Sequence, residues 1–546
     1  MLLTVKKYIL RPIFFVVFLS CIAGIALLHP GLPPTHDGEY HIIRFYEFNK
    51  TLQGGDLYPR WASDLNKGYG VPLFNYVYPL PNYVASFLHV FGISFIYAFK
   101  LSMFLAILLG GIFIYLWTKM FWGSPGGVVS SVFYTFAPYH FLDIYIRGSI
   151  GEVWALAFFP AFLWSTTELF QKKKAVFVIL SGIFLSLIIF SHNILALMFM
   201  PVAISYMTFM IILSKQKLYA IRYSLYAFFL GFGLSAIFWL PALLEIKYVT
   251  GLQIYDIKNN FPEFYQLLIP SWGTGFSGGD VQNQMSFQIG IANLGAILGS
   301  IAYVYFGIKR KDKDISVTIF FLIWLAFVLF LMLKNSLFLW EKIVFMHYFQ
   351  FPWRFLSLVI LFCAFLAGSI VRIGKKKIVA FTMIFFSVIL GIGYAKPAFY
   401  HYRDDNYYIT RSNFIDGTNS PGNLFNTIWF NQELKKQKII ISIKDRKIIS
   451  TVIKPTTYTV TLFLKSDSNL TVNTAYFPGW EVFVDGKKTN IFITNKGLIS
   501  FFLDQGSHEV KIQFNDTIPR KIGKIITLVF FTGLLFILIR KRNDIM

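Results

Sequence analysis

The sequence has little charge, and most of that charge is basic. Only 14% of the 546 residues are charged, whereas about a quarter of the residues in a soluble domain are. By contrast, 56% of the residues are hydrophobic, and phenylalanine alone occurs 62 times. This balance excludes an ordinary soluble enzyme and indicates a chain that is solvated mainly by lipid.

Cysteine and the common catalytic motifs are also scarce. The two cysteines, Cys21 and Cys363, lie within apolar runs, so we expect no disulfide and learn little about the redox compartment. The sequence contains no glycine-rich phosphate loop, zinc-ligand spacing or nucleophile elbow. It therefore gives no sign of ATP use or of a serine hydrolase, and the energy for any reaction has to arrive in the substrate.

The net charge of +23 does not indicate a nucleic-acid partner, because the position of the charges matters more than their sum. The basic clusters lie at the ends of apolar runs, which is typical of cytoplasmic loops that hold membrane helices in one orientation. We therefore expect no nucleic-acid binding. The clusters are residues 172–174, 309–311, 375–377 and 540–542.

Apolar runs predict about twelve membrane-spanning helices, because about 20 apolar residues cross the hydrocarbon core and backbone in lipid must satisfy its own hydrogen bonds. The first run is predicted to be a retained helix and not a signal peptide, because it is long and no cleavage site precedes Asp37. The predicted spans are residues 8–29, 96–118, 127–143, 153–170, 175–191, 194–213, 223–243, 289–307, 315–333, 355–373, 378–395 and 522–539.

The basic residues also predict an orientation in the plasma membrane. With the N-terminus inside, every short loop on that side is basic on balance, as positive-inside topology requires. Both termini are then cytoplasmic, and the loops with isolated ionisable groups are extracytoplasmic. The basic inner segments hold Lys119, residues 172–174, Lys215 and Lys217, and residues 309–313, 375–377 and 540–542.

Two of the predicted outer segments are long. Residues 30–95 are expected to lie along the membrane surface, because residues 40–53 fit an amphipathic interfacial helix and residues 73–90 carry aromatic rings and prolines. Residues 397–520 alternate apolar and polar side chains between turn signals, which predicts a β-sandwich. The predicted organisation is a polytopic all-α membrane domain over residues 1–396, an extracytoplasmic β-sandwich domain over 397–520, and a final helix with a basic tail over 521–546.

The sharpest group of polar residues is at 35–39, just after the first span. The carboxylates of Asp37 and Glu39 can face one pocket if the backbone is extended there, because side chains alternate along an extended chain. A carboxylate at a membrane surface can deprotonate an acceptor hydroxyl, or bind a divalent metal that shields a phosphate. The structural alternative is that Asp37 caps the next helix and Glu39 faces water.

Arg147 and Glu152 bracket the predicted outer turn between the third and fourth spans. Charge at membrane depth is costly, so it is usually either paired or functional. Arg147 therefore either binds a phosphate or a sugar hydroxyl, or pairs with Asp143 or Glu152 to close the turn.

Arg354 follows Gln350 and the residues 351–353 where an outer loop enters the tenth predicted span. Its guanidinium suits a lipid phosphate at this depth, and the alternative is a snorkelling anchor. His192 lies at another predicted outer turn, where a histidine is either structural or part of the substrate site.

In the order of its parts, the sequence resembles the GT-C class of membrane glycosyltransferases. One span is followed by an acidic outer loop with interfacial helices, then by many spans and a terminal soluble outer domain. The resemblance implies that the catalytic base or metal ligand lies in the first outer loop, where Asp37 and Glu39 match.

Short motifs also resemble the bacterial YfhO-like proteins and the membrane proteins called 6-pyruvoyl-tetrahydropterin synthase-related. The resemblance covers nearly the whole chain and implies an inverting transfer from a polyprenyl-phosphate-linked sugar. The sequence has no soluble zinc-binding pterin site, so we do not expect pterin synthase activity. The motifs are residues 36–39, 350–354, 476–480, 484–487 and 506–508.

We therefore expect a glycosyltransferase in which Asp37 is the base, Glu39 assists it or binds metal, and Arg147 and Arg354 hold the donor phosphate. The loop at residues 244–288 is expected to close over the donor. The need for a metal and the acceptor, which can be a glycan, a lipid or a protein, are left open. Two alternatives are a flippase for lipid-linked saccharides, against which the sequence shows no interrupted spans in matching halves, and a non-catalytic cell-envelope assembly protein.

Overall fold

The computed structural model describes residues 2–251, 257–278, 282–410, 423–435, 441–442 and 446–543. The chain divides into two compact units. We call them the helical unit, formed by Met1–Gly38, Phe99–Phe232 and Ile254–Arg403, and the mixed unit, formed by Glu39–Ala98, Gly233–Gln253 and Asp404–Met546.

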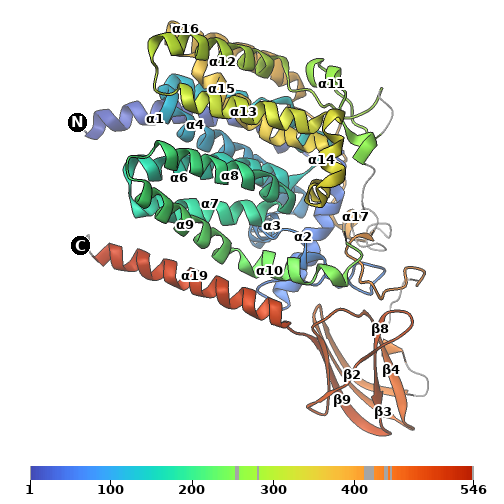
Figure 1. The fold of residues 1–546 in the computed structure, drawn as a ribbon. Coiled ribbons are helices and arrows are strands. Elements are labelled where there is room, and N and C mark those ends of the chain that lie inside the picture. Colours follow the sequence, from blue (N-terminus) through green and yellow to red (C-terminus); the bar gives the residue numbers. More distant parts are fainter. Residues whose placement is uncertain are drawn as a thin grey trace. The chain divides into compact units, whose positions relative to one another are not determined.

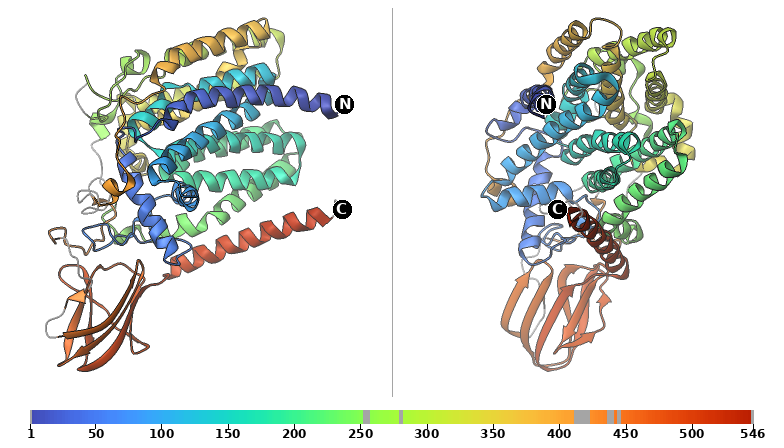
Figure 2. Two further views of the ribbon diagram at one scale, coloured as in Figure 1. Left: turned by 180° about the vertical axis from the view of Figure 1, so that it is seen from behind. Right: turned by 90° about the vertical axis from the view of Figure 1, so that its left-hand side faces the viewer.

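The helical unit is a bundle of apolar helices that run alongside one another (Figure 1). Figure 2 shows the same helices side by side from two further directions. The helices are α1 (Leu2–Gly24), α4 (Phe95–Thr135), α5 (Pro138–Leu142), α6 (Ile150–Lys172), α7 (Ala175–Ser191), α8 (Asn193–Leu213), α9 (Lys217–Leu234), α11 (Phe264–Leu268), α12 (Ile291–Arg310), α13 (Ile315–Met332), α14 (Leu337–Lys342), α15 (Leu356–Ile370) and α16 (Lys376–Gly391). Short helical turns are η1 (Ile25–Leu28), η3 (Asp143–Arg147), η5 (Ile257–Asn260), η6 (Lys334–Ser336), η7 (Val344–Phe349), η8 (Pro352–Phe355) and η9 (Ile392–Tyr394).

Helix α15 lies at the centre of this unit, and α16 at its edge. In the most apolar 18-residue stretch of each span, 94% of the residues are buried for the span that contains α15, and 17% for the span that contains α16. Both helices are apolar on every side, which in water would require complete burial. The exposed apolar surface of α16 is therefore the kind that lipid covers, and the protein is a multi-pass membrane protein.

In the described residues, eight helices are long and apolar enough to cross a membrane, or nine if the bent pair α9 and α10 (Ala236–Leu244) is one span. The difference from about twelve has two sources. The predicted spans 96–118 and 127–143 fall within one helical run, Phe95–Arg147, and the apolar helices Pro12–Leu28 and Ala175–Ser191 are shorter than a full span. The total of twelve stays a prediction.

Helix α4 consists of two helical halves joined by a kink, and the second half runs back along the first, where the hydroxyl of Ser131 donates to the carbonyl of Gly111. Gly123 has a φ of 71°, which an L-residue with a side chain rarely adopts, and Pro125 follows it. The second half of α4 then packs closely on α15, where a β-carbon at Gly126 would lie 2.8 Å from the carbonyl oxygen of Gly368. The indole of Trp122 donates to the carbonyl of Phe365 at 3.0 Å, which is a hydrogen bond between α4 and α15. Small residues thus allow the two backbones to approach, as in other membrane helix pairs.

Gly368→Ala is expected to lower the unfolding temperature in detergent, because the added methyl would meet Trp122 and the carbonyl of Gly126. Overpacking of this kind costs about 1–3 kcal/mol. Gly295→Ala in α12 is the matched control, since its β-carbon would meet nothing within 4 Å and alanine favours a helix by about 1 kcal/mol. Equal melting of the two variants would contradict the close packing of α4 on α15.

The mixed unit combines short helices with a β domain. In its described part, nine strands form two antiparallel sheets, with strand orders β1-β4-β8-β7 and β2-β3-β9-β5-β6 (Figure 1). Its helices are α2 (Gly38–Gln53), η2 (Leu73–Asn75), α3 (Leu80–Val90), α10, η4 (Ile246–Tyr248), α17 (Asp405–Thr410) and α19 (Ile518–Asn543). Its strands are β1 (Ile441–Ser442), β2 (Arg446–Lys454), β3 (Thr457–Leu464), β4 (Ser468–Ala475), β5 (Trp480–Val484), β6 (Lys487–Thr489), β7 (Phe492–Ile493), β8 (Leu498–Leu503) and β9 (Gly506–Phe514).

The two sheets share one apolar core. Val460 of β3 and Val510 of β9 are paired in register, and both are fully buried in the same cluster as Val472 of β4 and Phe501 of β8. The alternation of apolar and polar residues seen in the sequence therefore corresponds to real strands, because every second side chain faces this core. The assignment as a sandwich, and the domain boundaries at residues 396 and 520, stay predictions.

A buried ion pair ties the β domain to the helices of its own unit. The carboxylate of Glu245, just after α10, lies 3.0 Å from Nε of Arg520 in α19, and both side chains are almost fully buried. Arg520 also donates to the carbonyl of Pro478 at 2.9 Å, and the amide of Asn75 donates to Glu245 at 2.9 Å. The β domain is thus linked to α10 and η2 through the start of α19 and the segment just before β5.

Candidate functional site

The predicted site residues of the helical unit gather around η3, a single π-helical turn. Gly148 ends this turn with a φ of 67°, and a β-carbon there would lie 3.0 Å from the backbone nitrogen of Gly38. Because Gly148 has no side chain, the segment after α1 lies directly against the turn. The backbone N–H of His36 donates to the carbonyl of Ile146, and that of Asp37 to the carbonyl of Arg147, both at 2.9 Å.

The side chain of Asp37 is half-buried, and its carboxylate makes no hydrogen bond or ion pair with any residue that the structure describes. The hydroxyl of Thr35, not the Asp37 carboxylate, accepts the N–H of Gly38 at the start of α2, at 3.0 Å. Asp37 is therefore held by its backbone while its carboxylate stays available. Glu39 lies in the first turn of α2, where the mixed unit begins.

Glu152 is the centre of a buried group of charges. It is fully buried near the start of α6. Its carboxylate accepts hydrogen bonds from both terminal nitrogens of Arg147, at 2.6 Å and 2.7 Å. The phenol of Tyr139 donates to it at 3.2 Å. Arg147 also pairs with Asp143. Both pairs that the sequence offered as structural alternatives for Arg147 are therefore present.

Arg354, which lies in η8, contacts the same carboxylate of Glu152. Its Nε lies 2.9 Å from Oε1 of Glu152. The N–H does not point along that line, so the contact is ionic and leaves Nε without a hydrogen bond. Its Nη1 donates to the carbonyl of Phe349 at 3.0 Å and to Oε1 of Gln350 at 2.8 Å. These contacts fix the guanidinium beside Glu152.

Gln350 has an unusual backbone. Its φ of 66° and ψ of −52°, with the N–H of Phe351 donating to the carbonyl of Phe349 at 2.8 Å, define a γ-turn of the rare positive-φ form. Such a turn costs energy and persists where the surroundings require it. Here it directs both the Gln350 amide and the Phe349 carbonyl toward Arg354.

His192 lies at the edge of the group, in the turn between α7 and α8. Its Nδ1 accepts the N–H of Leu195 at 3.3 Å, so the ring proton is on Nε2, which lies 3.9 Å from Glu152. Burial lowers the pKa of His192 to about 3. The ring is therefore neutral at physiological pH, and it contributes a hydrogen-bond donor and not a charge.

The buried group contains two guanidinium groups, of Arg147 and Arg354, and two carboxyl groups, of Glu152 and Asp143. Within this group, three buried polar atoms have no hydrogen-bond partner among the described residues: Oδ2 of Asp143, Nε1 of Trp353 and Nε of Arg354. Buried polar groups are normally satisfied, so Oδ2 of Asp143 and Nε1 of Trp353 are open to a further polar group, whereas Nε of Arg354 already faces Glu152.

The sequence did not identify Tyr139 or Trp353 as site residues. The ring of Trp353 lies 4.7 Å under the Arg147 guanidinium, and its place in the motif at residues 350–354 was the only signal for it. Tyr139 follows a proline at the start of α5, with no pattern around it that would single it out. Only its contact with Glu152 places it in the group.

A loop of the helical unit lies over the Asp37 segment. The ring of His36 makes a hydrogen bond through Nε2 to the carbonyl of Thr274 at 2.8 Å and lies 4.4 Å from the ring of Phe276. Burial lowers the pKa of His36, so the ring is neutral and donates from Nε2 to this carbonyl. The predicted closing loop at 244–288 thus contacts the residue next to Asp37 through its part at 271–278.

No group of three or more His, Cys, Asp or Glu side chains suited to a metal ion occurs in the described residues. Asp37 and Glu39, the predicted metal candidates, therefore do not belong to such a group. A metal at this point would have to take its remaining ligands from water and substrate.

The sequence matches a family model over residues 74–399, described as "6-pyruvoyl-tetrahydropterin synthase related domain; membrane protein". The chain belongs to this family of membrane proteins. A second model, "Bacterial membrane protein YfhO", matches residues 425–527, which include β2 to β9 and the start of α19. The family match contains η3, Glu152, His192 and Arg354, whereas Asp37 precedes it.

A curated relative from Lactococcus lactis subsp. cremoris (strain MG1363), an "Uncharacterized protein", is 21% identical over 263 residues, which are 47% of this chain and 42% of that protein. A solved structure of the arabinofuranosyltransferase AftD from Mycobacteria is 13% identical, with a TM-score of 0.44, over 72% of this chain and 27% of that one. A mutant structure of AftD gives a TM-score of 0.42. The chain thus covers less than half of each of these proteins, and at these TM-scores the match assigns no activity.

Glu152→Gln is expected to lower the unfolding temperature strongly, because it leaves two buried guanidinium groups without their shared carboxylate. Removing one partner of a buried ion pair costs about 3–5 kcal/mol. Glu168→Gln in the same helix is the matched control, since its partner Lys172 is half-exposed and such pairs contribute about 0–1 kcal/mol. If both variants melt alike in detergent, Glu152 does not hold the group together.

Proposed function

We propose that this protein is a glycosyltransferase that moves a sugar from a polyprenyl-phosphate-linked donor to an acceptor at the outer face of the plasma membrane. The observation that carries the proposal is the available carboxylate of Asp37, tied by its backbone to Arg147 and so to the buried group around Glu152. A base next to guanidinium groups suits a reaction in which a hydroxyl loses a proton while a phosphate gains charge. The resemblance to the GT-C class supports the same reaction.

In this reaction Asp37 takes the proton of the acceptor hydroxyl. The acceptor oxygen forms a bond to the anomeric carbon of the sugar, and the bond between that carbon and the donor phosphate oxygen breaks. The lipid phosphate leaves with the electron pair and gains one negative charge. Attack and departure occur on opposite faces of the carbon, so its configuration inverts. Glu39 assists Asp37, or both bind a divalent metal.

Of the two guanidinium groups, Arg354 is the better candidate for the donor phosphate. Both terminal nitrogens of Arg147 already donate to Glu152. Arg354 keeps an Nη2 that makes no hydrogen bond with a described residue, and the buried indole N–H of Trp353 is similarly open. Guanidinium and indole N–H groups suit phosphate oxygens. Arg147, Glu152, His192 and Gln350 then orient Arg354 and complete the donor site.

The proposed orientation puts the site and the β domain outside the cell and both termini in the cytoplasm. The loop at 271–278 then acts as a lid that closes over the donor. Because it contacts His36, closure of the lid affects the residue next to the base. The β domain is proposed to steer the acceptor.

Asp37→Asn is expected to abolish transfer of a radiolabelled sugar from polyprenyl phosphate, with a loss of at least about 100-fold, because a general base contributes 10²–10⁴-fold. Folding should be unchanged, since the carboxylate has no partner among the described residues. Asp56→Asn, in the same first loop, is the control and should keep full activity. Normal transfer by a folded Asp37→Asn protein would remove Asp37 as the base, and transport of the lipid without transfer would favour the flippase.

Arg354→Lys is expected to raise the KM for the donor about 10- to 100-fold, because it keeps one charge beside Glu152 but removes the forked donors, and each hydrogen bond to a charged group contributes about 1.5–3 kcal/mol. Arg372→Lys is the control, because Arg372 pairs with Asp312 and Asp314 elsewhere in the unit. An unchanged donor KM for Arg354→Lys would exclude Arg354 as the phosphate ligand.

A further inference from the structure

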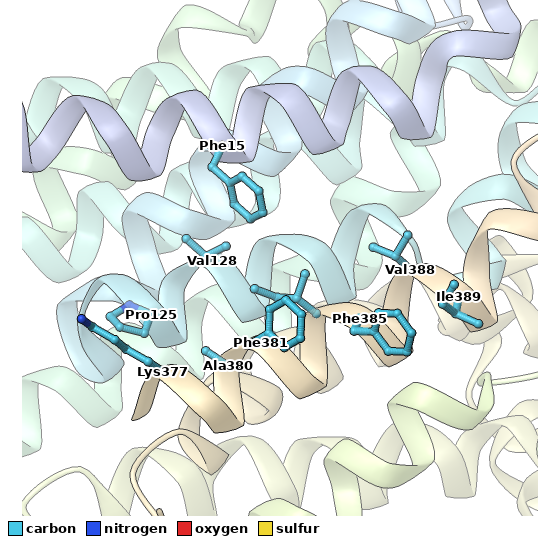
Figure 3. A pocket seen from close by; sticks show the side chains of 10 residues that line it. Phe15, Pro125, Val128, Lys377, Ala380, Phe381, Phe385, Val388 and Ile389 are labelled. Carbon is cyan, nitrogen blue, oxygen red and sulfur yellow. The ribbon is translucent and has the colours of Figure 1, made fainter. Parts of the chain in front are cut away.

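An apolar groove lies between α1, α4 and α16, away from the buried charges of the site. Its volume is about 460 Å³. Figure 3 shows Phe15 of α1 at the top, a row of α16 side chains that includes Phe381 and Ile389 lower down, and Val128 of α4 between them. The walls are therefore hydrocarbon from three helices.

The helices that form the groove are membrane helices, so its opening faces lipid. The helical runs that contain α4 and α16 are both long and apolar enough to span a membrane. On α16, Phe381 is 72% exposed and Phe385 is 51% exposed. From Lys377 to Ile389 the groove follows α16 for about 18 Å, at 1.5 Å per residue. Its occupant is thus a hydrocarbon chain of comparable length and not a polar solute.

One end of the groove carries positive charge. Lys377 lines it there, and Figure 3 shows its nitrogen at the end opposite to Ile389. The neighbours Lys375 and Lys376 are exposed as well, and none of the three side chains makes an ion pair or hydrogen bond with a described residue. Nearby Arg372, by contrast, is paired with two aspartates. The first N–H groups of α16 add to the positive field at this end.

We infer that this groove binds an anionic phospholipid, with its phosphate at Lys377 and one acyl chain along α16. A neutral lipid leaves the unpaired ammonium groups unused, and a free phosphate leaves the apolar walls exposed. Only a molecule with both an anionic head and a long chain complements both features, and basic pockets between membrane helices select such lipids. The inference goes beyond the proposed glycosyl transfer and does not depend on it.

The test uses the full-length protein in vesicles of equal parts phosphatidylcholine and phosphatidylglycerol. The protein is extracted gently, and its retained lipids are counted by native mass spectrometry. Wild-type protein should retain phosphatidylglycerol in preference to phosphatidylcholine. Lys377→Gln should lower that preference about fivefold, as expected for one lysine near a membrane surface. Ala380→Phe, which fills the groove while keeping Lys377, should lower retention of the bound lipid altogether.

Lys309→Gln is the matched control, because Lys309 lies in another basic cluster, against the ring of Tyr305, and does not line the groove. An equal loss of preference in Lys309→Gln and Lys377→Gln would show diffuse attraction and overturn the site. Equal retention of both lipids by the wild type would overturn the charge selection. Unfolding temperatures of all variants exclude loss of the fold as the cause.

Discussion

A single carboxylate inside an apolar bundle determines how the polar parts of the helical unit are arranged. Two guanidinium groups in so little water would be costly without a counter-charge, and Glu152 supplies it to both. Arg147 is the last residue of the turn before α6, and Arg354 lies in η8, just before α15. Their shared partner Glu152 therefore brings together segments that are more than 200 residues apart. The γ-turn at Gln350 and the neutral ring of His192 are arranged around this contact, and the Asp37 segment reaches it through Arg147.

Much of the helical fold could be predicted from hydropathy. The predicted span 175–191 is α7, and the span 315–333 differs from α13 by one residue, because long apolar runs have few alternatives to a helix in lipid. Hydropathy is averaged over a window, so it could not show the reversal within α4 at Gly123 or the break after α9. In the β domain the alternating pattern predicted strands well, but the pairing of β1 with β4 and of β3 with β9 depends on contacts distant in sequence.

For the site, residue type predicted more than geometry. Asp37, Arg147, Glu152, His192, Gln350 and Arg354 stood out as isolated ionisable or amide groups on the predicted outer side, away from the basic clusters of the inner side. Which of them bond to one another could not be predicted, because Asp143 and Glu152 are both close to Arg147 in sequence, on either side of it, and Arg147 pairs with both. Trp353 and Tyr139 are ordinary aromatic residues in a chain rich in them, so only the folded contacts with Arg147 and Glu152 distinguish them.

Gly148 has a consequence for how substrates can enter. With hydrogen in place of a side chain, it lets the Asp37 segment and the η3 turn touch backbone to backbone, so the carboxylate and the first guanidinium behave as parts of one rigid body. An opening of this region to a substrate therefore cannot come from separating these two. It has to come from the segment around Thr274, which is attached to this body through one imidazole and one phenyl ring and so can detach at modest cost.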